Sequence, residues 1–311
     1  MNKIQQFFEE EYNRISSFQN IFDTDHVYIH TDQEKHWNKI IQQELILFLK
    51  EKEIILSLDS DLKTLHDTID KKYTIFETVS FDEKGVNNNC RPVIEDIMFD
   101  FATSPGIKKI YNDFMEWLYL DIIKEDFYFQ KTPTIRVRMP GEQDHPHHNV
   151  LPTWHSDSFF GHNPREINIW FGITDNIDSG FWVMSLEDSA RWFEEHNYDR
   201  ERWREICISS DKDFNTRGFS LEKTYKAEDM YDKILLFDSR CIHTGTHRKQ
   251  PNLTTKFSMD VRIILVEDYK WAVIDNEPVF KGIGHRKAEF RPGAPYGYDG
   301  RSIKNLLREK K

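Results

Sequence analysis

The sequence has few cysteines, no long apolar run and fewer basic than acidic residues, and each of these features argues against a class of protein. Its three cysteines, Cys90, Cys207 and Cys241, lie far apart and form no CxxC pair, which offers no zinc-finger spacing and is typical of a reducing compartment. We expect them to be structural. No segment approaches the ~18 apolar residues of a membrane span, and the opening residues form an acidic amphipathic pattern rather than a signal peptide. A cytoplasmic location is therefore expected.

Basic residues are outnumbered by acidic ones. Lys and Arg together number 42 against 53 Asp and Glu, which gives a formal net charge of −11 over 311 residues. A surface of this sign repels the phosphates of nucleic acid and of anionic membranes. We expect a small-molecule partner rather than a nucleic acid or a membrane, while the oligomeric state is left open by the sequence.

The first part of the chain has helical periodicity. Apolar side chains recur at intervals of three and four residues from Trp37 to Leu49 and again from Ile107 to Ile123. Residues 1–130 are therefore predicted to be mainly helical and to pack on a sheet. No repeat or low-complexity tract interrupts the sequence, so we interpret residues 1–311 as one domain.

From Thr134 the apolar period changes to two. Ile135, Val137 and Met139 alternate with Arg136 and Arg138, which describes a strand with one polar face. Further strands are expected at residues 167–174, 180–184, 233–237 and 256–266.

Many short strands without regularly interleaved helices are typical of an antiparallel barrel or jelly roll. We predict a mainly β fold with flanking helices, in which a double-stranded β-helix (jelly-roll or cupin-like) barrel follows the helical N-terminal third. The barrel core is expected over residues 131–270, with an insertion around 188–230, and residues 271–311 are expected to be a tail that wraps around the barrel and ends in a short basic helix.

The strongest local motif is His155-Ser156-Asp157. Residues two apart in an extended segment point to the same side, so this imidazole and this carboxylate can share a metal ion. A chain of this length often contains such a pair by chance, so the motif needs further partners.

A third candidate ligand, His243, follows the strand predicted at 233–237. Two imidazoles and one carboxylate on one face of an octahedral ion leave open positions for a bidentate co-substrate and dioxygen, as in non-haem iron(II) oxygenases. Zinc would prefer a tetrahedral set of ligands. The three residues therefore predict an iron(II) site.

The strand after His243 carries a polar row at alternate positions. Lys256, Ser258, Asp260 and Arg262 fall on one face, and the residues between them are apolar. Lys256 with Ser258 is suited to the distal carboxylate of 2-oxoglutarate, and Arg262 to a second carboxylate or to Asp260. The alternative is that the row faces solvent on an edge strand.

These motifs together resemble the iron(II)/2-oxoglutarate-dependent dioxygenase superfamily. Over Thr134 to Val266, the phrases FDSRCIHTGTH and TTKFSMDVRI are most similar to phytanoyl-CoA-dioxygenase-like hydroxylases, in particular the streptomycin-biosynthesis oxygenase group. The resemblance implies iron(II), 2-oxoglutarate and dioxygen at one site. It makes His155, Asp157 and His243 the iron ligands, Lys256 with Ser258 the 2-oxoglutarate clamp and Arg262 a secondary carboxylate contact. Many members have Arg where this chain has Lys256, and the alternative is that Lys256 and Arg262 exchange these roles.

The resemblance also implies a reaction, the hydroxylation of a C–H bond in a small polar metabolite with release of succinate and carbon dioxide. An amino sugar, cyclitol, nucleotide-linked sugar or amino acid fits the family. Asp157 disfavours halogenation, because Gly or Ala at that place would open a position for halide. Desaturation, epimerisation and ring closure remain open.

Several other residues are candidates for the substrate or co-substrate pocket. Asn168 is expected to contact the co-substrate, and Arg136, Arg138 and Trp170 the substrate, if their strand faces line the barrel interior; solvated faces are the alternative. His145, His147 and His148 form a second cluster, which Pro146 and Gly141 make irregular. We interpret it as a loop at the mouth of the site, with His147 toward the substrate.

Two other classes of protein fit the same barrel. A cupin-type isomerase, epimerase or hydrolase would use zinc or no metal, and a jelly-roll binding module would need neither metal nor chemistry. Neither class requires the polar row of Lys256, Ser258 and Arg262.

Overall fold

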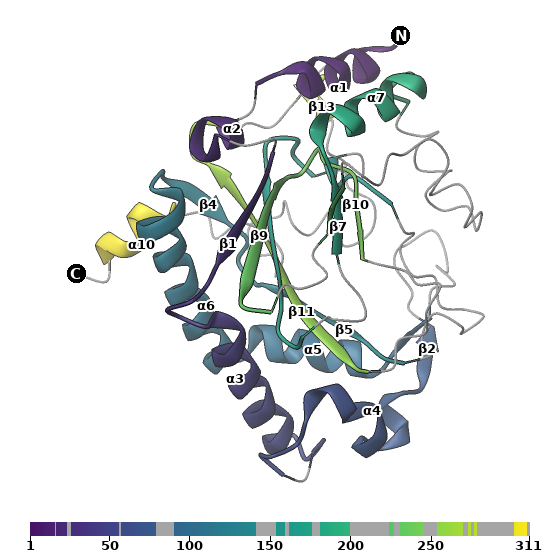
Figure 1. Ribbon diagram of the computed structural model, residues 1–311, viewed down its shortest axis with the longest axis vertical. Coiled ribbons are helices and arrows are strands. Elements are labelled where there is room, and N and C mark those ends of the chain that lie inside the picture. The colour runs from purple at the N-terminus through teal and green to yellow at the C-terminus, as the bar shows by residue number, and fades with distance from the viewer. Residues whose placement is uncertain are drawn as a thin grey trace.

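A computed structural model describes residues 1–15, 17–23, 26–55, 57–78, 90–140, 154–158, 162–175, 181–199, 224–226, 231–245, 254–269, 273–274, 277–278 and 302–309. Its centre is a six-stranded antiparallel sheet in the order β1-β9-β6-β11-β4, with β5 also paired to β11 (Figure 1). These strands are β1 (Val27–Thr31), β4 (Phe127–Phe129), β5 (Thr134–Arg138), β6 (Ile167–Gly172), β9 (Lys233–Asp238) and β11 (Lys256–Leu265).

Helices cover one face of this sheet. They are α3 (Trp37–Glu51), α5 (Ile94–Thr103) and α6 (Pro105–Trp117), and α6 continues into a π-helical turn at Leu118–Ile123 (Figure 1). Odd-numbered side chains of β6 and β11 enter the core on this side, as where Phe171 packs on Phe114 of α6 with ring centroids 5.5 Å apart. The C-terminal helix α10 (Ile303–Glu309) buries Ile303 in the same core.

A second, three-stranded sheet faces the opposite side of the main sheet. Its order is β10-β7-β8, with β7 (Phe181–Met184), β8 (Thr224–Lys226) and β10 (His243–Gly245). Aromatic rings join the two sheets: Trp170 of β6 stacks on Phe181 of β7 with centroids 4.9 Å apart, and Phe237 of β9 lies 4.9 Å from the His243 ring. Side chains at even-numbered positions of β6 and β11 therefore point between two sheets.

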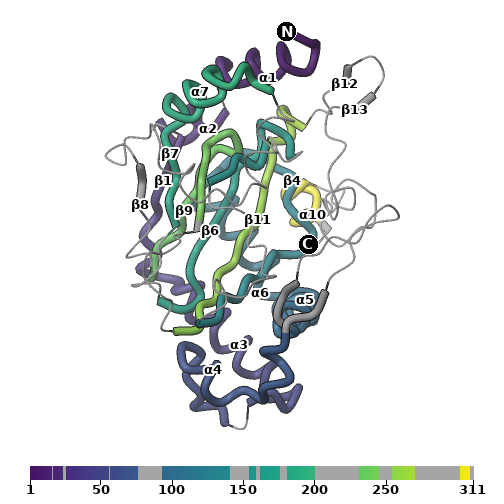
Figure 2. Tube along the Cα trace, turned by 90° about the vertical axis from the view of Figure 1, so that its right-hand side faces the viewer, coloured from purple at the N-terminus to yellow at the C-terminus, as the bar shows by residue number. Residues whose placement is uncertain are grey.

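Two further helices, α1 (Lys3–Asn13) and α7 (Leu186–Glu195), lie side by side at one end of the sheets, as both views show (Figures 1 and 2). Tyr12 of α1 packs on Phe193 of α7, with ring centroids 4.8 Å apart. The remaining elements are small: α2 (Ser17–Phe22), α4 (Leu65–Thr68), single 3-10 turns at Leu62–Thr64 and Lys71–Tyr73, and the pairs β2 (Phe76–Thr78) with β3 (Cys90–Pro92) and β12 (Val273–Ile274) with β13 (Glu277–Pro278).

The mainly β fold with flanking helices is confirmed, and β5, β6, β7, β9 and β11 begin within a residue of the predicted strands. The mainly helical character predicted for residues 1–130 is consistent with the structure, and the short strands β1, β2, β3 and β4 also lie there. The part of the chain that the structure describes forms separate sheets and no closed barrel. Cys241 is buried and forms no disulfide. No helix among the described residues has both the length and the apolar character needed to cross a membrane.

Candidate metal centre

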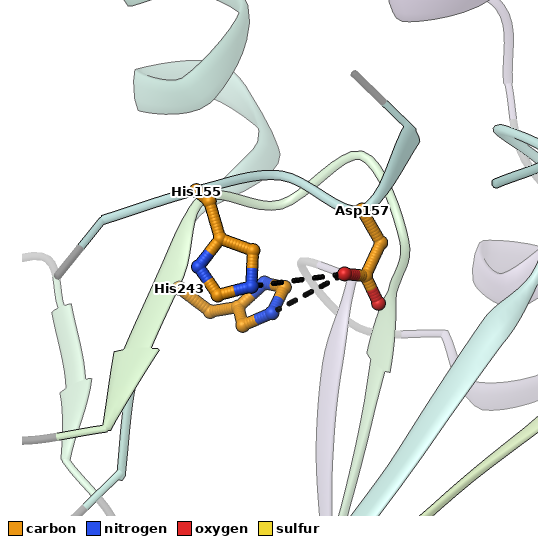
Figure 3. Close-up of side chains that lie close together, drawn as sticks. All are labelled: His155, Asp157 and His243. Carbon is orange, nitrogen blue, oxygen red and sulfur yellow. Dashed lines mark ion pairs between the residues drawn. The ribbon is translucent and has the colours of Figure 1, made fainter. Parts of the chain in front are cut away.

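The two candidate imidazoles are brought together by the backbone. His155 and His243 pair as an isolated antiparallel bridge, in which each backbone N–H donates to the carbonyl of the other at 2.9 and 2.8 Å. Residues paired in this way place their side chains next to each other. The two rings consequently lie with centroids 4.3 Å apart (Figure 3).

Asp157 completes the group. Its Oδ1 atom lies 3.7 Å from Nε2 of His155 and 3.9 Å from Nε2 of His243 (Figure 3). These distances are too long for hydrogen bonds. They suit atoms that share one ion, since two ligand atoms each about 2.1 Å from a metal lie at most about 4.2 Å apart. One potential ligand atom from each residue lies within 4.8 Å of the others.

The second oxygen of Asp157 is held by the protein. Oδ2 accepts hydrogen bonds from Nδ2 of Asn168 at 3.1 Å and from Nε and Nη2 of Arg262 at 3.0 and 2.9 Å. Burial alone would raise the pKa of Asp157, but the Arg262 guanidinium, helped by nearby histidines, holds that pKa well below its ordinary range. The carboxylate is therefore ionised, with Oδ1 directed toward the imidazoles.

His243 is oriented in the same way by its other nitrogen. Its Nδ1 lies 3.0 Å from the backbone carbonyl of Cys241. A carbonyl only accepts, so Nδ1 carries the proton and Nε2 presents its lone pair, as second-shell contacts of metal-bound histidines do. Burial lowers the pKa of His243, which favours the neutral ligand form. His155, Asp157 and His243 form a centre that fits iron(II), with two nitrogen donors and one oxygen donor.

The polar row on β11 lies on the same side of the main sheet as this centre. In register, Arg262 is opposite Asn168 on β6, and Lys256 is opposite Arg138 on β5. The Lys256 side chain is only 4% exposed, which argues against the solvent-facing alternative. Ser258 lies between these residues and is partly buried.

Two expected pocket arginines already have carboxylate partners. Nε of Arg136 lies 2.6 and 3.1 Å from the oxygens of Asp260, and Nη1 of Arg138 lies 3.2 Å from Oε1 of Glu95. Arg262 was expected to bind a second carboxylate or Asp260, and in the structure its Nε and Nη2 atoms bond to Oδ2 of Asp157. Asp260 is paired with Arg136 from the neighbouring strand.

Of the remaining candidate substrate contacts, the structure describes Trp170 but not His147. Trp170 is buried against Phe181 in the aromatic contact between the two sheets. His147, like the neighbouring His145 and His148, lies outside the described residues.

Sequence reasoning missed a group of buried hydroxyls behind the metal centre. Tyr12 of α1 bonds to Ser156 and Ser158, the two residues that flank Asp157. The serines are visible in the sequence beside the aspartate, but nothing local connects them with a tyrosine more than a hundred residues earlier. Arg240, which is fully buried, was also missed.

No protein-family model and no curated protein matches the sequence. The chain is similar to several solved structures. EvdO2 from Micromonospora carbonacea var. aurantiaca, complexed with 2-oxoglutarate, is 13% identical with a TM-score of 0.40, and the match covers 86% of this chain and 96% of that chain. The non-heme alpha ketoglutarate dependent epimerase SnoN from nogalamycin biosynthesis is 12% identical with a TM-score of 0.38, over 96% of both chains. A prolyl hydroxylase from Trichoplax adhaerens, solved with a hypoxia inducible factor peptide, is 11% identical with a TM-score of 0.36, over 86% and 96% of the two chains.

Likenesses at these identities and TM-scores establish neither a family nor an activity. Function is therefore inferred from the side chains around His155, Asp157 and His243.

Proposed function

We propose that the chain is an iron(II)- and 2-oxoglutarate-dependent oxygenase that oxidises a small polar metabolite. One observation carries the proposal: two imidazole nitrogens and one carboxylate oxygen lie within 4.8 Å of one another, and they are the donor set of a facial triad. A tetrahedral zinc site would call for a different donor set.

The carboxylate geometry supports an ion with open positions. Because Oδ2 of Asp157 is occupied by Asn168 and Arg262, only Oδ1 is available to a metal. Three protein donors leave three positions of an octahedron free, enough for a bidentate oxo acid and dioxygen. When bound, iron(II) and 2-oxoglutarate supply the oxidation, which yields succinate, carbon dioxide and an oxidised substrate.

The residues of the polar row have separate tasks in this proposal. Lys256 and Ser258 bind the distal carboxylate of 2-oxoglutarate by a charge-assisted hydrogen bond and a hydroxyl contact. Arg262 positions Asp157 instead of contacting the co-substrate directly. The ion pair of Arg136 with Asp260 lies on the same face and presents polar groups to a substrate. Hydroxylation is the expected reaction on this scaffold, which we propose to be a jelly roll.

The experiment is an anaerobic titration with iron(II) and then 2-oxoglutarate. A weak charge-transfer band in the visible range is expected only when both are present, and His155→Ala should lack it. Lys256→Met keeps the three metal ligands and should need a higher 2-oxoglutarate concentration to develop the same band. A wild-type protein that binds iron(II) but shows no band at saturating 2-oxoglutarate would rule out the oxygenase and leave the cupin-type isomerase or hydrolase.

Screening metabolites for stimulated succinate release would then identify the substrate class. A metal-free binding module and a cupin-type enzyme both predict neither the band nor any succinate, so the two measurements separate the oxygenase from the other two classes of protein.

A further inference from the structure

The N-terminal helix α1 contacts the segments that carry the metal ligands. Its Tyr12 side chain is 3% exposed, and its hydroxyl lies 3.0 Å from Oγ of Ser156 and 3.1 Å from Oγ of Ser158. The two serine hydroxyls are themselves 2.8 Å apart. The phenol therefore completes a ring of three hydroxyls with the residues that precede and follow Asp157.

The same hydroxyl reaches the segment that leads to His243. Tyr12 donates to the carbonyl of Arg240 at 2.9 Å, and Ser156 donates to the carbonyl of Ser239 at 3.0 Å. The phenolic oxygen of Tyr12 thus joins the turn holding His155 and Asp157 to the turn before His243, in addition to the direct Ser156 bond and the backbone bridge between His155 and His243. The two ligand segments come from distant parts of the sequence, so their relative position depends on contacts of this kind.

The C-terminal end of helix α1 is held by two arginine side chains, Arg240 and Arg165. The fully buried Arg240 guanidinium donates to the carbonyl of Glu11, and to that of Arg14 at 3.0 Å, at the C-terminal end of the helix. Cations are favoured at that end of a helix. Arg165 pairs with the Glu11 carboxylate through two hydrogen bonds of 2.9 and 3.1 Å. The residues on either side of Tyr12 along the chain are consequently anchored, Glu11 by Arg165 and Arg240 and Arg14 by Arg240.

The number and position of the hydrogen-bond partners of the Tyr12 hydroxyl indicate more than a packing role. A tyrosine that served packing alone would need one acceptor for its proton, as Tyr111 of α6 has in the carbonyl of Gln130 at 2.6 Å. Tyr12 has three polar partners, and two of them immediately precede and follow Asp157. Outer-shell contacts that orient metal ligands commonly affect metal affinity by 10–100-fold.

We propose that Tyr12 is a positioning residue of the metal centre, whose hydroxyl sets the distance between the Asp157 turn and the His243 segment and so tunes the affinity for a divalent metal. The proposal rests on the metal centre of the proposed function, but not on 2-oxoglutarate or on any substrate. It assigns helix α1 a role in metal binding that no ligand motif indicates.

The test compares Tyr12→Phe with Tyr111→Phe in the full-length apoprotein. Each change removes one buried phenolic hydroxyl from a helix, so both should lower the melting temperature to a similar extent. Co(II) affinity is then measured by calorimetry and by the visible spectrum of the bound ion. We expect Tyr12→Phe to bind Co(II) about tenfold more weakly, with an altered spectrum, and Tyr111→Phe to bind within about twofold of the wild type.

Equal Co(II) affinity of Tyr12→Phe and wild type, or equal losses in both variants, would overturn the proposal. If Tyr12→Phe does not fold, Ser158→Ala tests the same ring of hydroxyls and should also weaken Co(II) binding, whereas unchanged affinity there counts against it. Wild-type binding of Co(II) without a 2-oxoglutarate-dependent iron(II) band would refute the oxygenase and leave this proposal standing. Absence of Co(II) binding in the wild type would refute both.

Discussion

Asp157 shows how one side chain serves two purposes. Its Oδ1 faces the two imidazoles, while its Oδ2 accepts three hydrogen bonds from Asn168 and Arg262. Hydrogen bonds between ions are about twice as strong as neutral ones, so Arg262 is the dominant restraint. Without it Asn168 alone would hold Oδ2, and the carboxylate could rotate more easily and offer both oxygens to a metal.

Removing that restraint should weaken metal binding. We expect Arg262→Leu to lower the Co(II) affinity by about 10–100-fold, because the carboxylate loses both its orientation and the cation that keeps it ionised. Calorimetric titration measures this. Arg136→Leu is the matched control, since Arg136 pairs with Asp260 and not with a ligand, and an equal loss there would contradict the explanation.

The buried ion pair of Asp238 with Arg240 makes a prediction about stability. Arg240 is fully buried and bonds both oxygens of Asp238 at 2.9 and 2.8 Å. Asp238→Asn leaves this cation without its charge partner and should lower the free energy of unfolding by about 3–5 kcal/mol. Asp260→Asn is the control, because its partner Arg136 is 39% exposed and such pairs contribute about 1 kcal/mol or less. Urea unfolding at pH 7 measures both.

The same pair has a defined pH dependence. Burial would raise the pKa of Asp238, but the Arg240 guanidinium and His26 lower it below the ordinary value. A carboxylate whose pKa is lower in the folded state stabilises that state fully above its unfolded pKa of about 3.9, and this contribution is lost as pH falls toward the folded pKa. The difference in unfolding free energy between wild type and Asp238→Asn should shrink by about 1 kcal/mol from pH 5 to pH 3. A constant difference over that range would contradict the assignment.

At the scale of one element, the two faces of strand β11 have different roles: one packs in the hydrophobic core and the other carries the polar row. Met259 is fully buried in the core under the helices, while its neighbour Ser258 points to the opposite side, between the sheets. Successive residues of a strand alternate in this way. One strand therefore supplies both the packing of the main sheet and the polar row beside the metal centre.

Neighbouring substitutions on β11 should have opposite effects. Met259→Ala is expected to lower the free energy of unfolding by about 2–5 kcal/mol, because it leaves a cavity in the core. Ser258→Ala should leave stability nearly unchanged and raise the KM for 2-oxoglutarate about fivefold, the equivalent of one lost hydrogen bond of ~1 kcal/mol. Denaturant unfolding and succinate release measure the two effects, and a stability loss without any change in KM for Ser258→Ala would show that its hydroxyl does not contact the co-substrate.

At the scale of the whole molecule, the metal ligands exist as a site only in the folded chain. His155 and Asp157 belong to one turn and His243 to a strand of the second sheet. A ligand that binds only the folded state stabilises it by RT ln(1 + [L]/Kd), about 2.7 kcal/mol at one hundred times Kd. The ion should therefore raise the melting temperature of the protein.

For a chain of 311 residues that stabilisation corresponds to a shift of roughly 4 °C. Thermal melts with Co(II) and with a chelator measure the shift. His155→Ala should show almost none of it, while Tyr111→Phe should keep it in full. A shift of equal size in His155→Ala would indicate that the ion binds elsewhere.

Much of the sheet could be predicted from local periodicity, whereas β1 could not. The alternation around Lys256, Ser258 and Arg262 requires only that successive side chains of a strand point to opposite faces. The strand β1, Val27–Thr31, was instead included in the helical third. It is short and lies between helices, and its pairing with β9 is a contact with residues some two hundred positions later. Tertiary pairing of this kind overrides a local pattern.

The sequence by itself determined which potential metal ligands are present. In His155-Ser156-Asp157 it also determined that two of these ligands share one side of the chain. Only the tertiary structure decided that the backbone of His155 pairs with that of His243, that Arg262 binds Asp157 rather than Asp260, and that Tyr12 bonds to the serines beside the ligand. The physical reason is that backbone geometry fixes the direction of neighbouring side chains, whereas partners from distant segments are chosen by strand register and by which charges are buried together.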